Sequence, residues 1–394
     1  MGTAARQRPQ SSPPALPPDL MREVLARCDH ETLARCAASS RLLCRCMLDD
    51  PAILRRRAEG FAPSLLLGLF HGSRDVGVRF LEAPTASVAP RDPIRGFMSA
   101  NADLLRTLEE PAACRGGLVV LRRGRRALRT TVEMHLCDPM TGRRRLLPQP
   151  EVNGSSVAIL SEEDAGSSGP FQLLAVDVIC GWWKGSWITH LETQIFSSPE
   201  AFPTATPCGG AWGPIRRALL PAPRAMPGGS PPVVINRVVH WLHKSSAQYE
   251  HDVLALHADE GRTELIRGPR EITSTDDVLL AATADRRLSV VAIEELVISV
   301  SVLSEEESRS WERHTVVVRE GILAPARTIW LDCFGEKCGT VVIRVNFMPG
   351  RVLLNLETKE VMHMPAEEAL PRRCYVYEMD VPSLAAVLLN EFRV

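Results

Sequence analysis

The chain has 394 residues, a formal net charge of −1 and 45% hydrophobic residues, which is enough for a small module and a large domain with its own core. The near-zero charge gives no general attraction to nucleic acid or to an anionic membrane. No stretch approaches the about eighteen apolar residues of a membrane span. The eleven cysteines follow no secretory signal. We therefore expect a reducing compartment (cytoplasm or nucleus), no structural disulfides, and neither nucleic-acid nor membrane partners.

The amino-terminal region is expected to hold a small helical module. Residues 1–14 are rich in Pro, Ser and Ala and are expected to be a disordered leader. Residues 15–60 carry apolar residues at helical spacing, which predicts two or three short amphipathic helices. Pro17 and Pro18 suit a helix start because no amide donor is needed there, and Asp29 is a suitable N-cap for a second helix. A module this short buries its apolar surface poorly, so we expect it to dock on a partner.

This pattern resembles the F-box, the segment by which substrate receptors attach to the Skp adaptor of cullin-RING ubiquitin ligases. The matching residues are Leu16, Pro17, Asp19, Leu20, Glu23, Val24, Leu25, Arg27, Leu33, Ser39 and Pro51. The second half is degenerate, because Cys28-Asp29 stands where the family often has Leu-Pro and Leu42-Leu43 stands in place of a Trp. The resemblance implies that the adaptor is bound by Leu16, Pro17, Leu20, Val24, Leu25, Leu33 and Pro51. The alternative is a helical hairpin that packs on the rest of the protein.

From about residue 61 onward, the signal changes to paired strands. Apolar runs separated by turns with Asp, Gly or Pro recur at intervals of about 45 to 60 residues. Five units are visible, at residues 116–137, 171–196, 233–256, 279–303 and 329–356, and residues 65–81 with 374–379 are expected to complete a sixth or seventh. Antiparallel units repeated at this period are typical of propeller blades. The predicted fold is therefore α+β and multidomain, with a small all-α module followed by a large all-β propeller-like repeat domain over 61–394. The alternative is an array of β-sandwiches.

The repeat region also resembles the F-box-associated propeller-like domain of plant F-box proteins. The resemblance rests on the segments 114–118, 138–143, 239–242 and 377–380, in this order. Together, the two resemblances imply a substrate-receptor subunit of an SCF-type cullin-RING ubiquitin ligase, in which the helical module binds the Skp adaptor and the β domain recruits a target protein. Such a subunit is not itself an enzyme. Because the repeats of a propeller bury their faces against one another, we expect the β region to fold without the helices.

We find no sequence motif for catalysis, a cofactor or a metal. The phosphate-binding loop, the nucleophile elbow and the zinc-protease helix are all missing from the sequence. His240 and His243 are three residues apart, which on a strand directs them to opposite faces. Cys333 and Cys338 flank a predicted hairpin and are expected to be buried thiols. We therefore predict no catalytic residue, no cofactor and no metal site.

Three tryptophans surround a Gly-flanked turn at Trp182, Trp183 and Trp187. Large aromatic side chains on a loop tip often dominate the binding energy of an interface. One interpretation is that these tryptophans contact the target protein, and the other is that they pack between blades. Two alternatives to the ligase function remain, a propeller-type carbohydrate-binding protein or hydrolase, and an F-box scaffold that acts outside a ligase.

Overall fold

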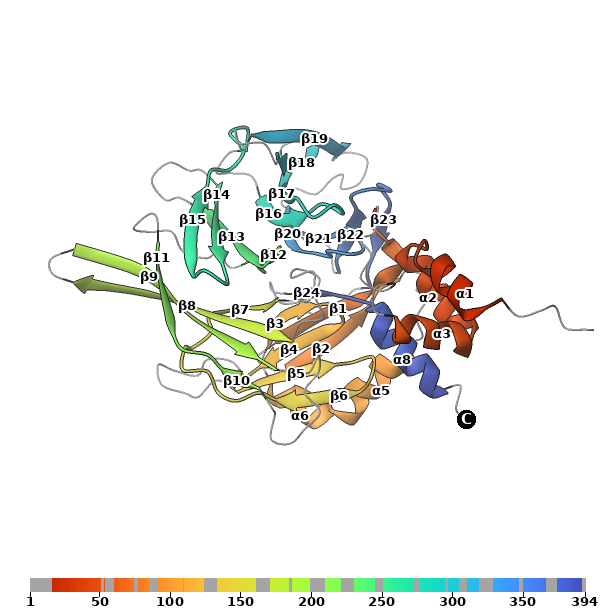
Figure 1. Cartoon of the computed structure of the whole chain (residues 1–394). Helices are drawn as coiled ribbons and strands as arrows, with labels where there is room; N and C mark the ends of the chain where they lie inside the picture. Colours follow the sequence, from red (N-terminus) through yellow and green to blue (C-terminus); the bar gives the residue numbers. More distant parts are fainter. Residues whose placement is uncertain are drawn as a thin grey trace, which may run out of the picture.

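A computed structural model describes residues 16–391 except for 51–52, 54–59, 74–76, 85–90, 109, 124–132, 161–170, 184–185, 199–209, 221–229, 245–250, 273–276, 295–296, 305–309, 319–328, 347–349 and 366–373. The described chain folds into a six-bladed β-propeller with a group of helices on one side (Figure 1). Pro51 and the leader 1–14 lie outside the described residues.

Each blade is one antiparallel sheet that extends outward from the axis of the ring. From the innermost strand outward, blade 1 contains β24 (Cys374–Glu378), β1 (Leu66–Ser73) and β2 (Gly77–Glu82). In the same direction, blade 2 contains β3 (Glu110–Arg115), β4 (Leu118–Arg122), β5 (Met134–Asp138) and β6 (Arg143–Leu146). Blade 3 contains β7 (Ser156–Leu160), β8 (Gln172–Trp183), β9 (Ser186–Ser197) and β10 (Ala211–Trp212), with β11 (Arg216–Leu219) also paired to β9.

The other three blades are regular four-stranded sheets. Blade 4 contains β12 (Val233–Ile235), β13 (Val238–Lys244), β14 (His251–His257) and β15 (Arg262–Ile266). Blade 5 contains β16 (Asp277–Ala282), β17 (Leu288–Ile293), β18 (Val297–Leu303) and β19 (Trp311–Val318). Blade 6 contains β20 (Ile329–Phe334), β21 (Thr340–Val345), β22 (Val352–Asn355) and β23 (Val361–His363).

The hydrophobic core is divided among the interfaces between blades. Strand residues alternate between the two faces of a sheet, so each blade presents one apolar face to each neighbour. On β13, for example, Val239 and Trp241 belong to the cluster shared with blade 3, whereas Val238 and Leu242 belong to the cluster shared with blade 5. This alternation explains why the sequence shows near-continuous apolar runs.

The ring is closed in blade 1 by strands from the two ends of the described chain. β24 pairs antiparallel with β1, and Leu66 lies opposite Glu378 at the start of that ladder. Blade 1 has three strands, and its outer strand β2 is contacted by α6 (Ala102–Thr107), which follows α5 (Asp92–Ala100). Helices therefore stand where a fourth strand would lie, and they protect an edge that could otherwise pair with another chain.

The helices α1 (Pro18–Leu25), α2 (His30–Ser39) and α3 (Arg41–Asp49) together form the helical module, which lies beside α8 (Val381–Glu391) (Figure 1). A 3-10 turn over Pro63–Leu65 leads from this region into β1. The predicted cap is confirmed at Asp29, whose carboxylate accepts a hydrogen bond of 2.7 Å from the Thr32 amide and thereby acquires a lowered pKa. Among the helices that the structure describes, none is long and apolar enough to cross a membrane.

The propeller prediction is confirmed, and the described residues form six blades. The segments 65–81 and 374–379, which the sequence assigned to no complete unit, form one blade together. The first and last strands of the ring belong to the same sheet. The helices α5, α6 and α8 were not predicted. For α8 a signal was present, since Asp380, Pro382 and Ser383 precede an apolar run, and Asp380 accepts a hydrogen bond of 3.2 Å from the Ser383 amide as an N-cap does.

Candidate functional site

One side of α1 is apolar and exposed. Leu20 and Val24 are spaced four residues apart and therefore lie along the same side of the helix, where they are 48% and 54% exposed. Leu16, two residues before the first residue of α1, is 49% exposed. Pro17, just before the helix, is also exposed. These are four of the seven residues for which the sequence predicted adaptor binding.

A neighbouring side of α1 faces the protein's own core. Leu25 on α1 and Leu33 on α2 are each only 2% exposed, and they belong to one hydrophobic cluster with Leu384, Ala385 and Leu388 of α8. In this arrangement, Leu25 and Leu33 present no surface to a partner, because their side chains hold the helices together. Leu25 and Leu33 are therefore removed from the predicted docking set, whereas residues 16, 17, 20 and 24 are exposed and Pro51 lies outside the described residues.

The same hydrophobic cluster continues into the propeller. It includes Phe70 of blade 1, Val119 and Leu121 of blade 2, and Tyr377 of the ring-closing strand. The helical module is therefore packed on the rest of the protein on one side while α1 keeps an apolar side exposed. This packing gives the exposed side of α1 a fixed position relative to the blades.

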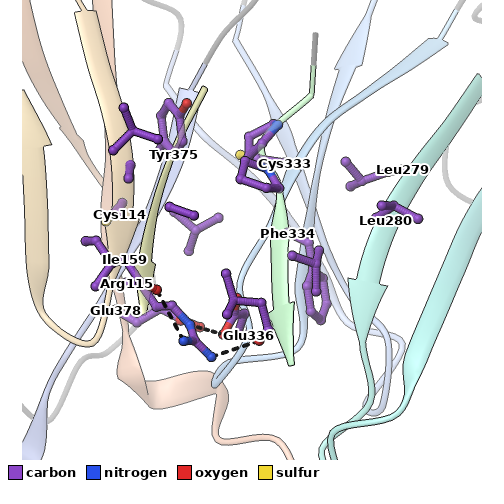
Figure 2. A pocket seen from close by; sticks show the side chains of 18 residues that line it. Cys114, Arg115, Ile159, Leu279, Leu280, Cys333, Phe334, Glu336, Tyr375 and Glu378 are labelled. Atoms are coloured by element: carbon purple, nitrogen blue, oxygen red, sulfur yellow. Dashed lines mark hydrogen bonds and ion pairs between the residues drawn. The ribbon is translucent and has the colours of Figure 1, made fainter. Parts of the chain in front are cut away.

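An axial channel runs between the six innermost strands, all of which contribute lining residues (Figure 2). Its free volume is about 50 Å³, room for a few water molecules. Cys333 and Tyr375 lie toward one end, whereas Arg115, Glu336 and Glu378 gather at the other. Glu378 lies two residues before the N-cap of α8, so the charged end is next to the helices.

The Arg115 guanidinium lies across the charged end of the channel and joins four blades. From β3 of blade 2, its Nε donates to Glu336 in the β20–β21 turn of blade 6 at 2.8 Å. Its Nη2 donates to the Val234 carbonyl oxygen at 2.9 Å, and its Nη1 to the Ile159 carbonyl oxygen at 3.4 Å. The guanidinium group therefore donates its hydrogen bonds to other groups of the protein. Arg115 has a structural role, in which it closes this end of the channel. Arg115 lies in segment 114–118, which carries part of the resemblance to the F-box-associated domain, but the sequence gives no sign of this role.

Glu378 is a buried carboxyl group beside Arg115. Its Oε1 accepts hydrogen bonds from the amides of Lys337 at 2.8 Å and Cys338 at 2.7 Å. Burial, together with the nearby charge of Glu336, raises the pKa of the Glu378 carboxyl group above its ordinary value. The two hydrogen bonds indicate a structural role, in which Glu378 fixes the β20–β21 turn against the ring-closing strand.

The three tryptophans of the predicted target-binding loop lie near the tip of the long β8–β9 hairpin. Trp182 pairs with Trp187 across the hairpin, and Trp183 pairs with Ser186. The side chains of these tryptophans, and residues 184–185 between the strands, lie outside the described part of the structure. Figure 1 shows this hairpin at the end of the molecule opposite the helical module.

The two histidines of β13 lie on opposite faces, as their spacing predicts. His240 lies on the same face as Val238 and Leu242, toward blade 5, and His243 on the same face as Trp241, toward blade 3. Within the described residues, no group of three His, Cys, Asp or Glu side chains could hold a metal ion. Cys333 and Cys338 are both buried, as expected.

Comparison with known proteins identifies the family. The family profile described as "Domain of unknown function (DUF7595)" matches residues 78–389, which include blades 2 to 6, strand β24, and most of β2 and α8, whereas β1 lies before the match. The chain belongs to the DUF7595 family. The match begins after the helical module. The module of this DUF7595 protein is therefore not part of the segment that matches the family profile. No curated protein matches the chain.

Solved structures similar to this DUF7595 protein include several sugar-processing proteins. The chain is 10% identical to the α-L-arabinanase of Penicillium chrysogenum, with a TM-score of 0.38, 68% of this chain and 81% of that chain covered. It is 12% identical to the endo-arabinase of Bacteroides thetaiotaomicron, with a TM-score of 0.31, 64% of this chain and 90% of that chain covered. Similarity at this level carries no argument about activity.

Proposed function

We propose that this DUF7595 protein is the substrate-receptor subunit of an SCF-type cullin-RING ubiquitin ligase. The observation that carries the proposal is the exposed apolar side of α1. Leu20 and Val24 on this side, and Leu16 just before the helix, are about half exposed, and they coincide with the most specific part of the F-box resemblance. In this proposal, Pro17 and these three residues bind the Skp adaptor. The protein then acts in the cytoplasm or nucleus.

In this proposal, the propeller is the domain that binds the target protein. Such a subunit needs no catalytic residue, since it contributes proximity and orientation between a target lysine and the loaded conjugating enzyme. The hydrophobic cluster shared by α1, α8 and blades 1 and 2 supports this role, because it couples the docking side rigidly to the target-binding domain. A flexible connection between α1 and the propeller would fix the orientation of the bound target less well.

We place the target contact at the tip of the β8–β9 hairpin, with Trp182, Trp183 and Trp187 as its aromatic residues. The hairpin lies at the opposite end of the molecule from α1, so a target held there leaves the adaptor surface uncovered. Affinity purification with wild type and with Trp187→Ala, analysed by mass spectrometry, tests this assignment. We expect Trp187→Ala to lose target proteins and to retain the adaptor. Recovery of the same proteins with both chains would contradict it.

Sugar binding or hydrolysis in the axial channel receives less support. A pocket for a small organic ligand usually has a volume of about 300 to 1,000 Å³, whereas the channel offers about 50 Å³. Arg115 and Glu336, two of its charged residues, are bound to each other. The channel is therefore filled mainly by the protein itself.

Adaptor binding is tested with purified full-length protein and a purified Skp adaptor in a calorimetric titration. Leu20→Asp places a charge against an apolar partner surface and should weaken binding by about 30-fold or more, which corresponds to about 2 kcal/mol. The matched control is Leu219→Asp on β11, where the leucine is 75% exposed and lies on a distant blade. The control should bind as wild type does. Equal binding of wild type and Leu20→Asp, with both folded, would refute the proposal.

A further inference from the structure

Two buried thiols meet at the joint where the propeller ring closes. The Sγ atoms of Cys333 and Cys374 are 3.2 Å apart. Cys333 lies on β20, the innermost strand of blade 6, and Cys374 begins β24, the innermost strand of blade 1. Both side chains are almost fully buried, in the hydrophobic cluster between these two blades. The two thiols thus contact each other across the interface between blade 6 and the ring-closing strand.

A β-bulge directs Cys333 toward this contact. In a regular strand, Leu331 and Cys333 would face the same blade because they are two residues apart. The ladder between β20 and β21 shifts register between these two residues, and Asp332 is the extra one. As a result, Leu331 packs toward blade 5, whereas Cys333 packs toward blade 1 and Cys374. Arg344 and Arg351 hold Asp332 at 3.2 and 2.6 Å, which fixes the bulge.

We propose that Cys333 and Cys374 form a reversible disulfide that locks blade 6 to the ring-closing strand when the protein meets a hydroperoxide. The inference does not depend on the ligase function. A disulfide needs a sulfur–sulfur distance near 2.05 Å, so the two sulfur atoms have to approach by about 1 Å. Rotation of the two side chains within the cluster supplies a movement of this size.

The chemistry requires one hydroperoxide molecule for each disulfide. One thiolate attacks the peroxide oxygen, the O–O bond breaks, and a sulfenic acid and water (or an alcohol) form. The second thiol attacks the sulfenic sulfur and displaces its oxygen as water. For hydrogen peroxide the sum is two thiols plus one peroxide to one disulfide plus two waters. Thiol reductants of the cytosol reverse the reaction by exchange.

Access and reactivity of the pair follow from its surroundings. Cys333 lines the axial channel, whose free volume admits a molecule about as small as water or hydrogen peroxide. Burial and the neighbouring Cys374 thiol raise the pKa of Cys333, so little reactive thiolate is present at neutral pH. Oxidation should therefore be slow near pH 7 and faster at higher pH. Formation of the disulfide closes a loop between residues 41 apart, which restricts the unfolded chain.

The test uses the purified, fully reduced chain treated with hydrogen peroxide at pH 7 and pH 9, followed by alkylation and peptide mapping by mass spectrometry without reductant. We expect a cross-linked peptide pair that contains Cys333 and Cys374, formed faster at pH 9. The melting temperature should rise by about 5 °C or more and return after treatment with dithiothreitol. The exposed Cys180 serves as an internal control for oxidation.

Three variants separate this pair from the other thiols. Cys333→Ala and Cys374→Ala should each abolish both the cross-link and the peroxide-induced stabilisation, and either one suffices if the other folds poorly. Cys338→Ala removes a buried thiol of the same cluster and should leave both effects intact. Oxidation of Cys180 without a cross-link between Cys333 and Cys374 at either pH would overturn the proposal. A cross-link that leaves the melting temperature unchanged would overturn the locking of the ring.

Discussion

Tyr377 on the ring-closing strand donates a hydrogen bond of 3.1 Å to the carbonyl oxygen of Gly117 in the β3–β4 turn. Strand β24 is therefore attached to blade 2 as well as to its own sheet. Gly117 has a φ of 74°, and a side chain there would place its Cβ 2.5 Å from Cβ of Asp380. Only glycine allows the turn to approach the start of α8 this closely.

Loss of this hydrogen bond should weaken ring closure. Tyr377 is fully buried, so Tyr377→Phe keeps the packing of the ring and removes the donor for the buried Gly117 carbonyl group. We expect the free energy of unfolding to fall by about 1–2 kcal/mol. Urea denaturation measures it. Tyr375→Phe, at a more accessible position on the same strand, is the comparison and should have the smaller effect. A larger loss of unfolding free energy in Tyr375→Phe than in Tyr377→Phe would contradict this role of Tyr377 in ring closure.

Removal of the helical module should uncover α8. Leu384 and Leu388 pack against the helices, and each fully buried leucine contributes about 1.5–3 kcal/mol. A chain of residues 61–394 should therefore keep a strand-dominated circular dichroism spectrum but melt earlier and bind an apolar fluorescent dye. If 61–394 melts like the full-length protein and binds no dye, the shared cluster contributes little to stability.

His240 should make the protein sensitive to mild acid. Burial lowers the pKa of His240 to about 4. The unfolded side chain takes up a proton near its ordinary pKa of about 6.5. Between these values only the unfolded state is protonated, so the free energy of unfolding falls as the pH decreases, by up to about 1.4 kcal/mol per pH unit.

The His240 contribution is isolated by comparing variants from pH 7 to pH 4. His240→Gln retains a donor toward the Val233 carbonyl oxygen, which lies 3.3 Å from Nδ1 of the wild-type ring, but cannot titrate. We expect a flatter pH profile of the unfolding free energy. His314→Gln, at an exposed position on β19, should leave the profile of wild type unchanged. An equally steep profile in His240→Gln would assign the acid sensitivity to other groups.

Removal of the Asp332 charge should be strongly destabilising. Its carboxylate is buried between the guanidinium groups of Arg344 and Arg351, and Asp332→Asn takes the counter-charge from both. Breaking a buried ion pair on one side costs about 3–5 kcal/mol. Glu260→Gln, in the exposed pair with Arg262, should cost less than about 1 kcal/mol. Thermal and urea unfolding compare the two variants, and similar losses would argue against a structural role for Asp332.

The repeat pattern predicted the propeller because the faces of each blade are buried by neighbours, which leaves apolar runs at a regular interval. It could not assign 65–81 and 374–379 to one blade, since pairing between distant strands is not encoded in local spacing. The F-box resemblance selected Leu16, Leu20 and Val24, which are exposed, together with Leu25 and Leu33, which are buried. Periodicity places residues on a helix face but does not say which face another element, in this protein α8, will cover. The Cys333–Cys374 contact depends on a bulge, and a one-residue register shift leaves no signature in composition.

The arrangement of blade 1 also sets an order of events during synthesis. The helical module is translated before the blades, whereas α8, against which it packs, is translated after all six of them. Until then Leu25 and Leu33 cannot pack against α8, and the ring stays open because β24 has not been synthesised. A messenger with a premature stop codon before residue 374 therefore yields a chain with an open ring and unsupported helices. Synthesis of β24 and α8 is thus a condition both for a closed ring and for the packing that supports α1.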